Sequence, residues 1–205
     1  MKHLTLAILM AFGLFACTNE QSNLTQENSI DLSKFEKVDI PGTNFQRVIR
    51  KNADGKVLEE GLVENGKRNG TWVIYHSDRD VPKVVANFVN DLYNGPYFEF
   101  NKQGQVDLQC AYVNNVLHGY YARYRVGRKT EEGNYKMGKL DGVYKKYYEN
   151  RSIVQQENTY KDGQLHGKTR FYNEKGDVIV EYDYENGQKV KGGIVENNAT
   201  ANVEE

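Results

Sequence analysis

Apolar and polar residues alternate along most of the chain in short runs that end in glycine, asparagine or aspartate. One example is the run YYARYRV at 120–126, which is followed by Gly127-Arg128 and by a second run at 130–135. Alternation with a period of two is typical of half-buried strands, and turn residues at such short intervals favour hairpins over helices. The pattern therefore predicts an all-β protein built from successive antiparallel hairpins.

A string of about 23 to 25 residues recurs along the chain. Each copy has an apolar or aromatic residue, then Gly, Asn or Asp three positions later, Gly four positions beyond that, and an aromatic residue five beyond that. The copies are VENGKRNGTWVIY (63–75), FVNDLYNGPYFEF (88–100), YVNNVLHGYYARY (112–124), YKMGKLDGVYKKY (135–147) and YKDGQLHGKTRFY (160–172), and a degenerate sixth begins at Tyr184. Self-similarity at a fixed period predicts a repeat architecture.

Two positions of the repeat hold residues that tolerate positive φ. The first position holds Gly66, Asp91, Asn115, Gly138, Gly163 and Gly187. The second holds Gly70, Gly95, Gly119, Gly142 and Gly167. We expect a turn at the first position in every copy. In the last copy Lys191 stands where the register predicts the second glycine.

Two rows of aromatic residues follow the second glycine. The first row, two residues after it, is Trp72, Tyr97, Tyr121 and Tyr144, with Thr169 in the fifth copy. The second row, five residues after it, is Tyr75, Phe100, Tyr124, Tyr147 and Tyr172. We expect rings of neighbouring hairpins to pack on one another as the core, and the same aromatics are candidates for a binding surface.

The two rows are three residues apart, so a regular strand would point them to opposite faces of the sheet. Either a bulge redirects one row, or both faces are partly apolar and something covers the second face.

The period, the glycine in mid-motif and the flanking tyrosines resemble the MORN repeat, in the bacterial variant found in tandem in lipoproteins and in antitoxins of toxin–antitoxin pairs. The resemblance covers Val57 to Ile194, and Asp91, Asn115 and Thr169 depart from its pattern. It implies an elongated single antiparallel meander sheet of tandem β-hairpin repeats. It implies much less about activity.

Strand-like runs also flank Asp54-Gly55 within residues 45–63, which predicts a further hairpin before the repeats. We therefore divide the chain into a capping hairpin at 35–56, a repeat array at 57–195 and a polar, disordered tail at 196–205.

The first 16 residues, MKHLTLAILMAFGLFA, have the layout of a signal peptide, since their apolar run is too short to span a bilayer. The stretch from Leu14 to Cys17 resembles a lipobox, although Phe15 is bulkier than usual there. This predicts a lipid anchor on Cys17, followed by a disordered polar tether at 17–34. The alternative is a disulfide between Cys17 and Cys110, but the strand around Cys110 favours a buried thiol.

Charge excludes two classes of partner. Lys plus Arg number 27 against 28 for Asp plus Glu, and loss of Lys2 with the leader gives 26 − 28 = −2. A balance this close to neutral predicts neither a nucleic-acid surface nor a basic membrane-binding face. The 15 Tyr and 19 Gly beside 3 Pro fit half-buried strands with tight turns.

The sequence predicts no catalytic residues, no cofactor and no metal site. His118 and His166 share one register position two periods apart, and His76 has no nucleophile signature around it. The pairs Glu59-Glu60 and Glu131-Glu132 recur at equivalent strand positions, which indicates solvated positions rather than a catalytic dyad.

We therefore expect a non-enzymatic lipoprotein of the bacterial cell envelope, in the outer membrane because Thr18 rather than Asp follows Cys17. Its repeat sheet would be a protein-binding scaffold, held at the membrane through the lipid on Cys17. An immunity or antitoxin protein that neutralises a toxin is the alternative, followed by glycan or lipid recognition. The sequence does not identify the ligand.

Overall fold

The computed structural model describes residues 30–149 and 151–195. The expected signal peptide, Cys17, most of the expected tether and the tail at 196–205 lie outside the described residues.

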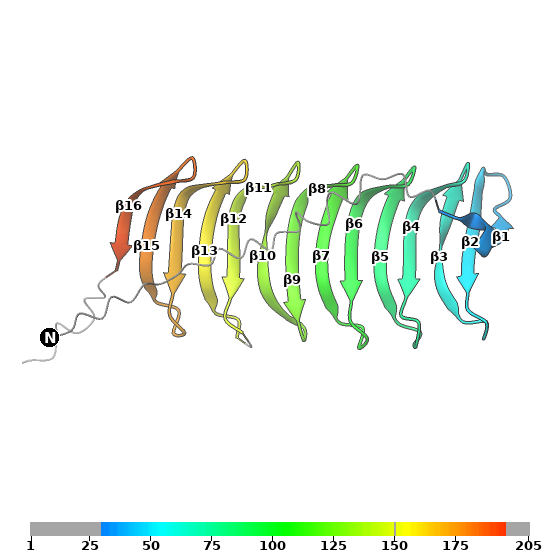
Figure 1. The fold of residues 1–205 in the computed structure, drawn as a ribbon, viewed down its shortest axis with the longest axis horizontal. Coiled ribbons are helices and arrows are strands. Elements are labelled where there is room, and N and C mark those ends of the chain that lie inside the picture. Colours follow the sequence, from blue (N-terminus) through cyan, green and yellow to red (C-terminus); the bar gives the residue numbers. More distant parts are fainter. Residues whose placement is uncertain (1–29, 150, 196–205) are drawn as a thin grey trace, which may run out of the picture.

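All described strands form one antiparallel sheet, and they follow one another in chain order (Figure 1). The strands are β1 (Glu36–Asp39), β2 (Phe45–Lys51), β3 (Val57–Glu64), β4 (Lys67–Tyr75), β5 (Pro82–Val89), β6 (Leu92–Phe100), β7 (Val106–Val113), β8 (Val116–Leu117), β9 (Gly119–Arg125), β10 (Arg128–Lys136), β11 (Lys139–Leu140), β12 (Gly142–Tyr147), β13 (Val154–Lys161), β14 (Gln164–Tyr172), β15 (Val178–Glu185) and β16 (Gln188–Ile194). The short strands β8 and β11 pair only with β7 and β10. The predicted all-β meander of successive hairpins is confirmed.

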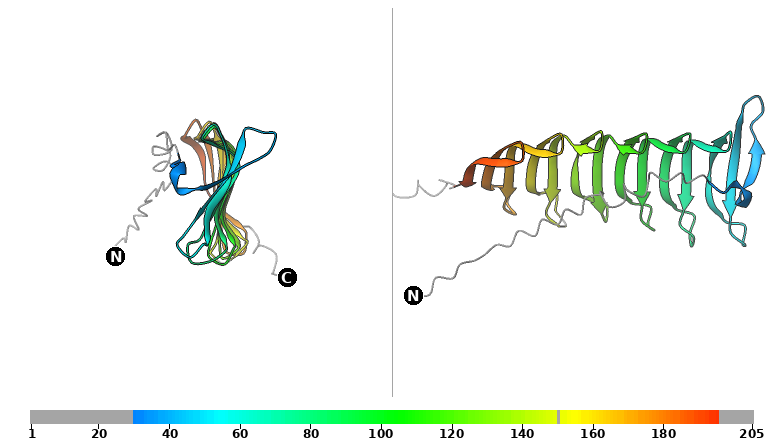
Figure 2. Two further views of the ribbon diagram at one scale, coloured as in Figure 1. Left: turned by 90° about the vertical axis from the view of Figure 1, so that its right-hand side faces the viewer. Right: turned by 45° about the horizontal axis from the view of Figure 1, so that its top comes forward.

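The sheet is a single elongated layer. Its strands lie side by side along the long axis, with β1 and β16 at opposite ends (Figure 1). Seen along that axis, the layer is bowed, and the short helix η1 (Leu32–Lys34) lies on one side of it (Figure 2).

A two-residue turn closes each repeat hairpin at the predicted position. Both central residues have positive φ, for example 51° at Asn65 and 78° at Gly66, which is the conformation of a type I′ turn. The other turns are Asn90-Asp91, Asn114-Asn115, Met137-Gly138, Asp162-Gly163 and Asn186-Gly187. The twist of a type I′ turn matches that of the strands, which explains why Gly, Asn and Asp recur there.

Each turn is also hydrogen-bonded to the hairpin before it. The N–H of the second turn residue donates to a carbonyl two residues beyond the preceding turn, as from Gly138 to Leu117 at 2.8 Å. The same bond joins Asp91 to Arg68, Asn115 to Tyr93, Gly163 to Leu140 and Gly187 to Leu165. The turns therefore form a continuous ladder along one edge of the array.

Asp91 and Asn115, which replace the turn glycine, add a second bond to this ladder. Asp91 Oδ1 accepts from the Arg68 backbone N–H at 2.9 Å, and Asn115 Oδ1 accepts from that of Tyr93 at 2.7 Å. The two departures from glycine thus give the preceding strand an acceptor that glycine cannot supply.

The second glycine marks a bulge. Glu60 pairs with Val73 but Leu62 pairs with Asn69, so one residue of β3 stands opposite three residues of β4 around Gly70. In the last hairpin the bulge is shorter, and Gly192, with φ of 105°, pairs with Tyr182. Gly192 therefore stands at the position of the first aromatic row, as Tyr97 does opposite Ala86, and not at the position of the second glycine.

One face of the sheet, which we call the core face, carries nearly all the buried side chains. They include Val48, Val63, Trp72, Ala86, Phe88, Leu108, Cys110, Leu117 and Tyr121. Large residues of the first aromatic row stand opposite small residues of the next strand, such as Trp72 opposite Ala86 and Tyr97 opposite Cys110. At Thr169 and Tyr182 the sizes are exchanged between the same two positions.

The two aromatic rows lie on opposite faces, so the second row is not part of the core. Neighbouring Glu131 and Glu132 must point to opposite faces. The Tyr144 hydroxyl donates to Glu131, whereas the Tyr147 hydroxyl donates to Glu132. The bulge at the glycine precedes both rows and does not bring them together.

Ring packing also differs from the expectation. First-row rings contact a third set of aromatics, two residues before the turn, rather than one another: Tyr97 lies 5.6 Å from Tyr112, and Tyr121 lies 5.4 Å from Tyr135. This set is Phe88, Tyr112, Tyr135, Tyr160 and Tyr184.

At the N-terminal end, side chains from the end of the expected tether and the start of the expected capping hairpin pack on the core face. Ile30, Leu32 and Phe35 contact the cluster around Trp72, and the Phe35 ring is 6.0 Å from the Trp72 ring. The expectation of a disordered tether is therefore wrong for residues 30–34, where Ile30 and Leu32 supply apolar surface that packs on the cluster around Trp72. Beyond them, β2 and β3 form the hairpin expected around Gly55.

Candidate binding surface

The other face of the sheet, which we call the outer face, carries the second aromatic row, here named the outer row. Its members are Tyr75, Phe100, Tyr124, Tyr147 and Tyr172, and all five are half-buried. The Tyr75 hydroxyl donates to Glu60 at 2.9 Å and the Tyr124 hydroxyl to Gln109 at 3.3 Å. Because each acceptor is on the neighbouring strand of the same face, these rings lie across the sheet rather than projecting from it.

After two outer-row members, Tyr75 and Tyr147, the next residue is hydrogen-bonded to the following repeat. His76 Nε2 lies 3.0 Å from the carbonyl oxygen of Phe100. In the same way, the Tyr148 hydroxyl donates to the carbonyl of Tyr172 at 2.6 Å. Together with the ladder of turns at the opposite strand ends, these bonds hold neighbouring repeats in a constant register.

The Glu132 carboxylate accepts hydrogen bonds from three side chains on the outer face. Partial burial disfavours its charge, but hydrogen bonds from Lys129, Tyr120 and Tyr147 outweigh burial and lower the pKa of the carboxyl to about 2. Burial and the Glu132 charge in turn raise the pKa of Tyr147 to about 12. The carboxylate and both phenols therefore keep these protonation states at neutral pH.

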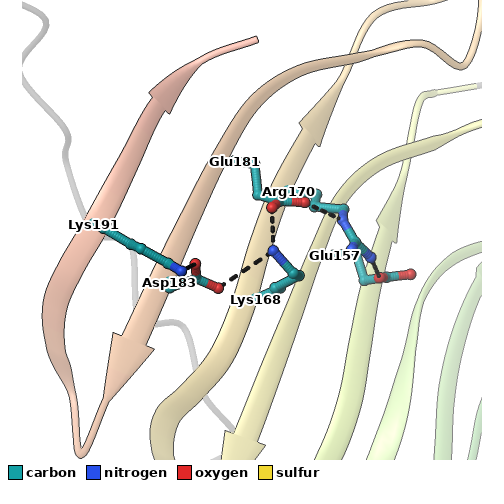
Figure 3. Close-up of polar contacts among 6 residues, drawn as sticks. All are labelled: Glu157, Lys168, Arg170, Glu181, Asp183 and Lys191. Carbon is teal, nitrogen blue, oxygen red and sulfur yellow. Dashed lines mark hydrogen bonds and ion pairs between the residues drawn. The ribbon is translucent and has the colours of Figure 1, made fainter.

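A charge network covers the outer face near the C-terminal end (Figure 3). Arg170 lies 3.1 Å from Glu157 and 2.7 Å from Glu181, so it bridges β13 and β15. Lys168 contacts Glu181 and lies 3.4 Å from Asp183, which Lys191 approaches at 3.3 Å. Lys145 also lies 3.5 Å from Glu157, so four cations and three anions take part in the network.

An aliphatic patch lies on the outer face beside two adjacent turns. Val89 pairs with Leu92 and Val113 pairs with Val116. The first three are exposed large hydrophobic residues, at 46%, 40% and 39% for Val89, Leu92 and Val113. The same positions in the other repeat hairpins hold charged or amide side chains: Glu64 and Lys67, Lys136 and Lys139, Lys161 and Gln164, Glu185 and Gln188.

The histidines occupy structural positions. His118 Nδ1 accepts from the N–H of Met137, in the next turn, at 3.4 Å. Asn69 and Asp141, at the same register, accept from Asn90 and Asp162. His166 differs, because its Nδ1 is buried and has no hydrogen-bond partner among the described residues.

The acidic pairs do not form dyads, since neighbouring members point to opposite faces. Glu131 accepts from Tyr121 and Tyr144 on the core face, and Glu59 pairs with Arg50 while Glu60 pairs with Arg47. Within residues 30–149 and 151–195, no three His, Cys, Asp or Glu side chains are grouped as a metal site requires.

Two features of this surface were missed in the sequence. Apolar residues beside a turn look like core residues, and only the register shows that Val89 and Val113 face outward. The second feature is an Asn-x-x-Gly loop that recurs in the sequence at 52–55, 101–104 and 173–176. In each copy the Asn side chain accepts hydrogen bonds from two backbone N–H groups of the loop.

No protein-family model matches the chain, and a search of curated proteins found no match. In the part of the chain that the structure describes, no helix is long and apolar enough to cross a membrane.

Proposed function

We propose that this chain is a non-enzymatic lipoprotein of the bacterial envelope, anchored through Cys17, and that its sheet is a MORN-type scaffold that binds a protein partner. The observation that carries the binding role is the aliphatic patch of Val89, Leu92, Val113 and Val116 on the outer face. A group of neighbouring exposed apolar side chains rimmed by polar ones has the chemistry of a protein-binding site.

The patch differs from the neighbouring hairpins, which carry charged side chains at the same positions. The flanking hairpins place Glu64, Lys67, Lys136 and Lys139 at the same register, so the repeat fold itself does not require apolar residues there. The core face is occupied by its own packed aromatics. Among the equivalent positions of the described repeat hairpins, only this patch therefore offers apolar side chains that a partner could bury with a gain in free energy.

The test combines crosslinking with substitution. A photoreactive amino acid at Leu92 in the anchored protein should yield one dominant protein adduct in cells, identified by mass spectrometry. The double variant Val89→Glu/Val113→Glu should remove that adduct, since it places charge where an apolar partner surface would be buried.

The matched control is Val143→Glu, because Val143 is exposed to a similar extent, at 42%, and lies outside the patch. It should leave the adduct unchanged. An adduct that survives the double variant in folded protein would contradict the proposed role of the patch.

The anchor is tested separately. Wild-type protein should incorporate radiolabelled palmitate and sediment with membranes, and Cys17→Ala should do neither. Continued labelling of that variant would exclude Cys17 as the lipidated residue.

A further inference from the structure

The outer row has a regular spacing along the array. Successive members are separated by two strands, as Tyr75 on β4, Phe100 on β6 and Tyr124 on β9, with one full-length strand between each pair. Neighbouring strands are about 4.8 Å apart, so the rings repeat at about 9.6 Å. The row therefore crosses five repeats at one constant interval.

The row also keeps its register along the array. The strands follow one another side by side along the long axis of the layer (Figure 1), and hydrogen bonds from His76 and Tyr148 join two repeats to the next. A ligand that follows the row must be extended, and it must present an apolar surface at the same interval.

Polar groups flank the rings. Gln109 and Glu132 lie beside Tyr124 and Tyr147 as hydrogen-bond acceptors, and Lys129 is a donor beside Glu132. Aromatic rings edged by donors and acceptors suit a ligand with apolar faces and hydroxyl groups at its rim. Sugar rings have this chemistry, because their C–H groups lie on the ring faces and their hydroxyls project from the edge.

We propose that the outer row binds an extended β-1,4-linked polysaccharide, with one disaccharide per repeat. In such a glycan successive sugars are turned over, so that equivalent faces recur once per disaccharide, a length close to two strand spacings of about 9.6 Å in total. Every second sugar would stack on one outer-row ring, and the sugar between would lie over the intervening strand.

This inference rests on the proposed function only in treating the outer face as a binding surface. The glycan site and the aliphatic patch lie at opposite ends of the strands: Leu92 begins β6 beside its turn, whereas Phe100 ends it. The two sites can therefore be altered independently.

The experiment titrates the purified full chain, in detergent, with six-sugar oligomers. The β-1,4-linked hexamers of N-acetylglucosamine and of glucose should bind, and the affinity should increase from two to six sugars as more rings are engaged. The α-1,4-linked glucose hexamer, which coils, should not bind. Sedimentation with purified peptidoglycan, chitin and cellulose then distinguishes the sources of such a strand.

The decisive variant is Tyr124→Leu/Tyr147→Leu, which removes two adjacent platforms and should weaken binding by about tenfold or more. Tyr124→Phe/Tyr147→Phe keeps both rings and should retain most of the affinity, which separates stacking from loss of the hydroxyl bonds. Tyr184→Leu is the matched control, since Tyr184 is a tyrosine that packs beside Tyr182 on the core face and lies outside the row.

Three results would overturn the glycan proposal: no binding of either β-linked hexamer, equal binding of the α-linked hexamer, or unchanged affinity of a folded Tyr124→Leu/Tyr147→Leu variant. If the Leu variant does not fold, equal affinity of all oligomer lengths for wild-type protein would have the same consequence. Loss of glycan binding with an intact Leu92 adduct refutes only this inference, whereas loss of the adduct with intact glycan binding refutes only the protein-binding role.

Discussion

The Tyr147 hydroxyl donates a hydrogen bond to Glu132, which lies diagonally across the β10 and β12 pair on the outer face. Tyr75 and Glu60, and Tyr124 and Gln109, repeat this relationship at the same separation of 15 residues along the chain. Phe100 and Val85 have the same separation of 15 residues, but Phe100 has no hydroxyl donor and Val85 has no side-chain acceptor. Donor and acceptor are therefore present together or absent together.

The first prediction concerns this pairing. Phe100→Tyr alone should destabilise the protein by about 1 kcal/mol, because a half-buried hydroxyl gains no acceptor. Adding Val85→Glu should supply the acceptor, so that the two substitutions show a favourable coupling of about 1 kcal/mol in a double-mutant cycle. Urea unfolding of the four proteins measures the coupling. Strictly additive effects would show that the pairing has no energetic content.

The second prediction concerns acid stability. The pKa of Glu132 is about 2 in the folded protein against an ordinary value of 4.5, so its contribution to stability is complete above about pH 4.5. That contribution, at most about 3 kcal/mol, is lost as the pH falls from 4.5 towards 2. Glu132→Gln should be less stable at neutral pH and should lose less stability over this interval.

Unfolding curves recorded at several pH values between 2 and 7 give the comparison. Glu149→Gln is the control, because the ion pair of Glu149 with Arg125 is largely exposed, at 65% and 70% of their side chains. Its stability should follow the wild-type pH dependence. If Glu132→Gln did so too, the carboxylate would contribute nothing to acid stability.

The third prediction ranks three Gly→Ala substitutions. A Cβ at Gly61 would lie 2.3 Å from the Trp72 ring, one at Gly133 would lie 2.8 Å from the Tyr144 ring, and one at Gly193 would meet nothing within 4 Å. Gly61→Ala should cost about 2–3 kcal/mol through overpacking and Gly133→Ala less, whereas Gly193→Ala should be near neutral. Thermal unfolding tests the order, and similar losses at all three positions would contradict it.

The fourth prediction uses the exchanged sizes at Thr169 and Tyr182. Thr169→Tyr should overpack the core face, and Tyr182→Gly should leave a cavity, each at a cost of about 1–3 kcal/mol. The double variant restores the large and small order of the other repeats, so its cost should be at least about 1 kcal/mol below the sum. Chemical denaturation of the two single variants and the double variant measures these losses of unfolding free energy. A loss in the double variant equal to the sum of the two single losses would show that the side chains pack independently.

The periodicity of the sequence was sufficient to predict the meander, because residues such as Gly66 and Asn115 tolerate the positive φ that a tight hairpin turn requires. It was not sufficient to assign the core face. Trp72 and Tyr75 are both aromatic, and what separates them is the small partner of Trp72 on the next strand, Ala86. That partner depends on the register between β4 and β5, which no residue type specifies.

The candidate site was less predictable for a related reason. Val89 and Leu92 have the composition of core residues, and only the alternation after buried Phe88 shows that they face outward. The outer row was recognised as a set of residues, but its separation from the core required the contacts of Glu131 and Glu132. Chemistry that depends on which face a side chain occupies is therefore visible only once the register is known.

The position of β1 and β16 at opposite ends of the layer determines how the array would respond to tension. A pull between its two ends acts across the strands, so the hydrogen bonds between neighbouring strands are loaded a few at a time rather than all together. Each repeat contacts only its neighbours, so hairpins would peel away one after another. Stretched between its two ends, the sheet would extend in steps of one repeat at low force.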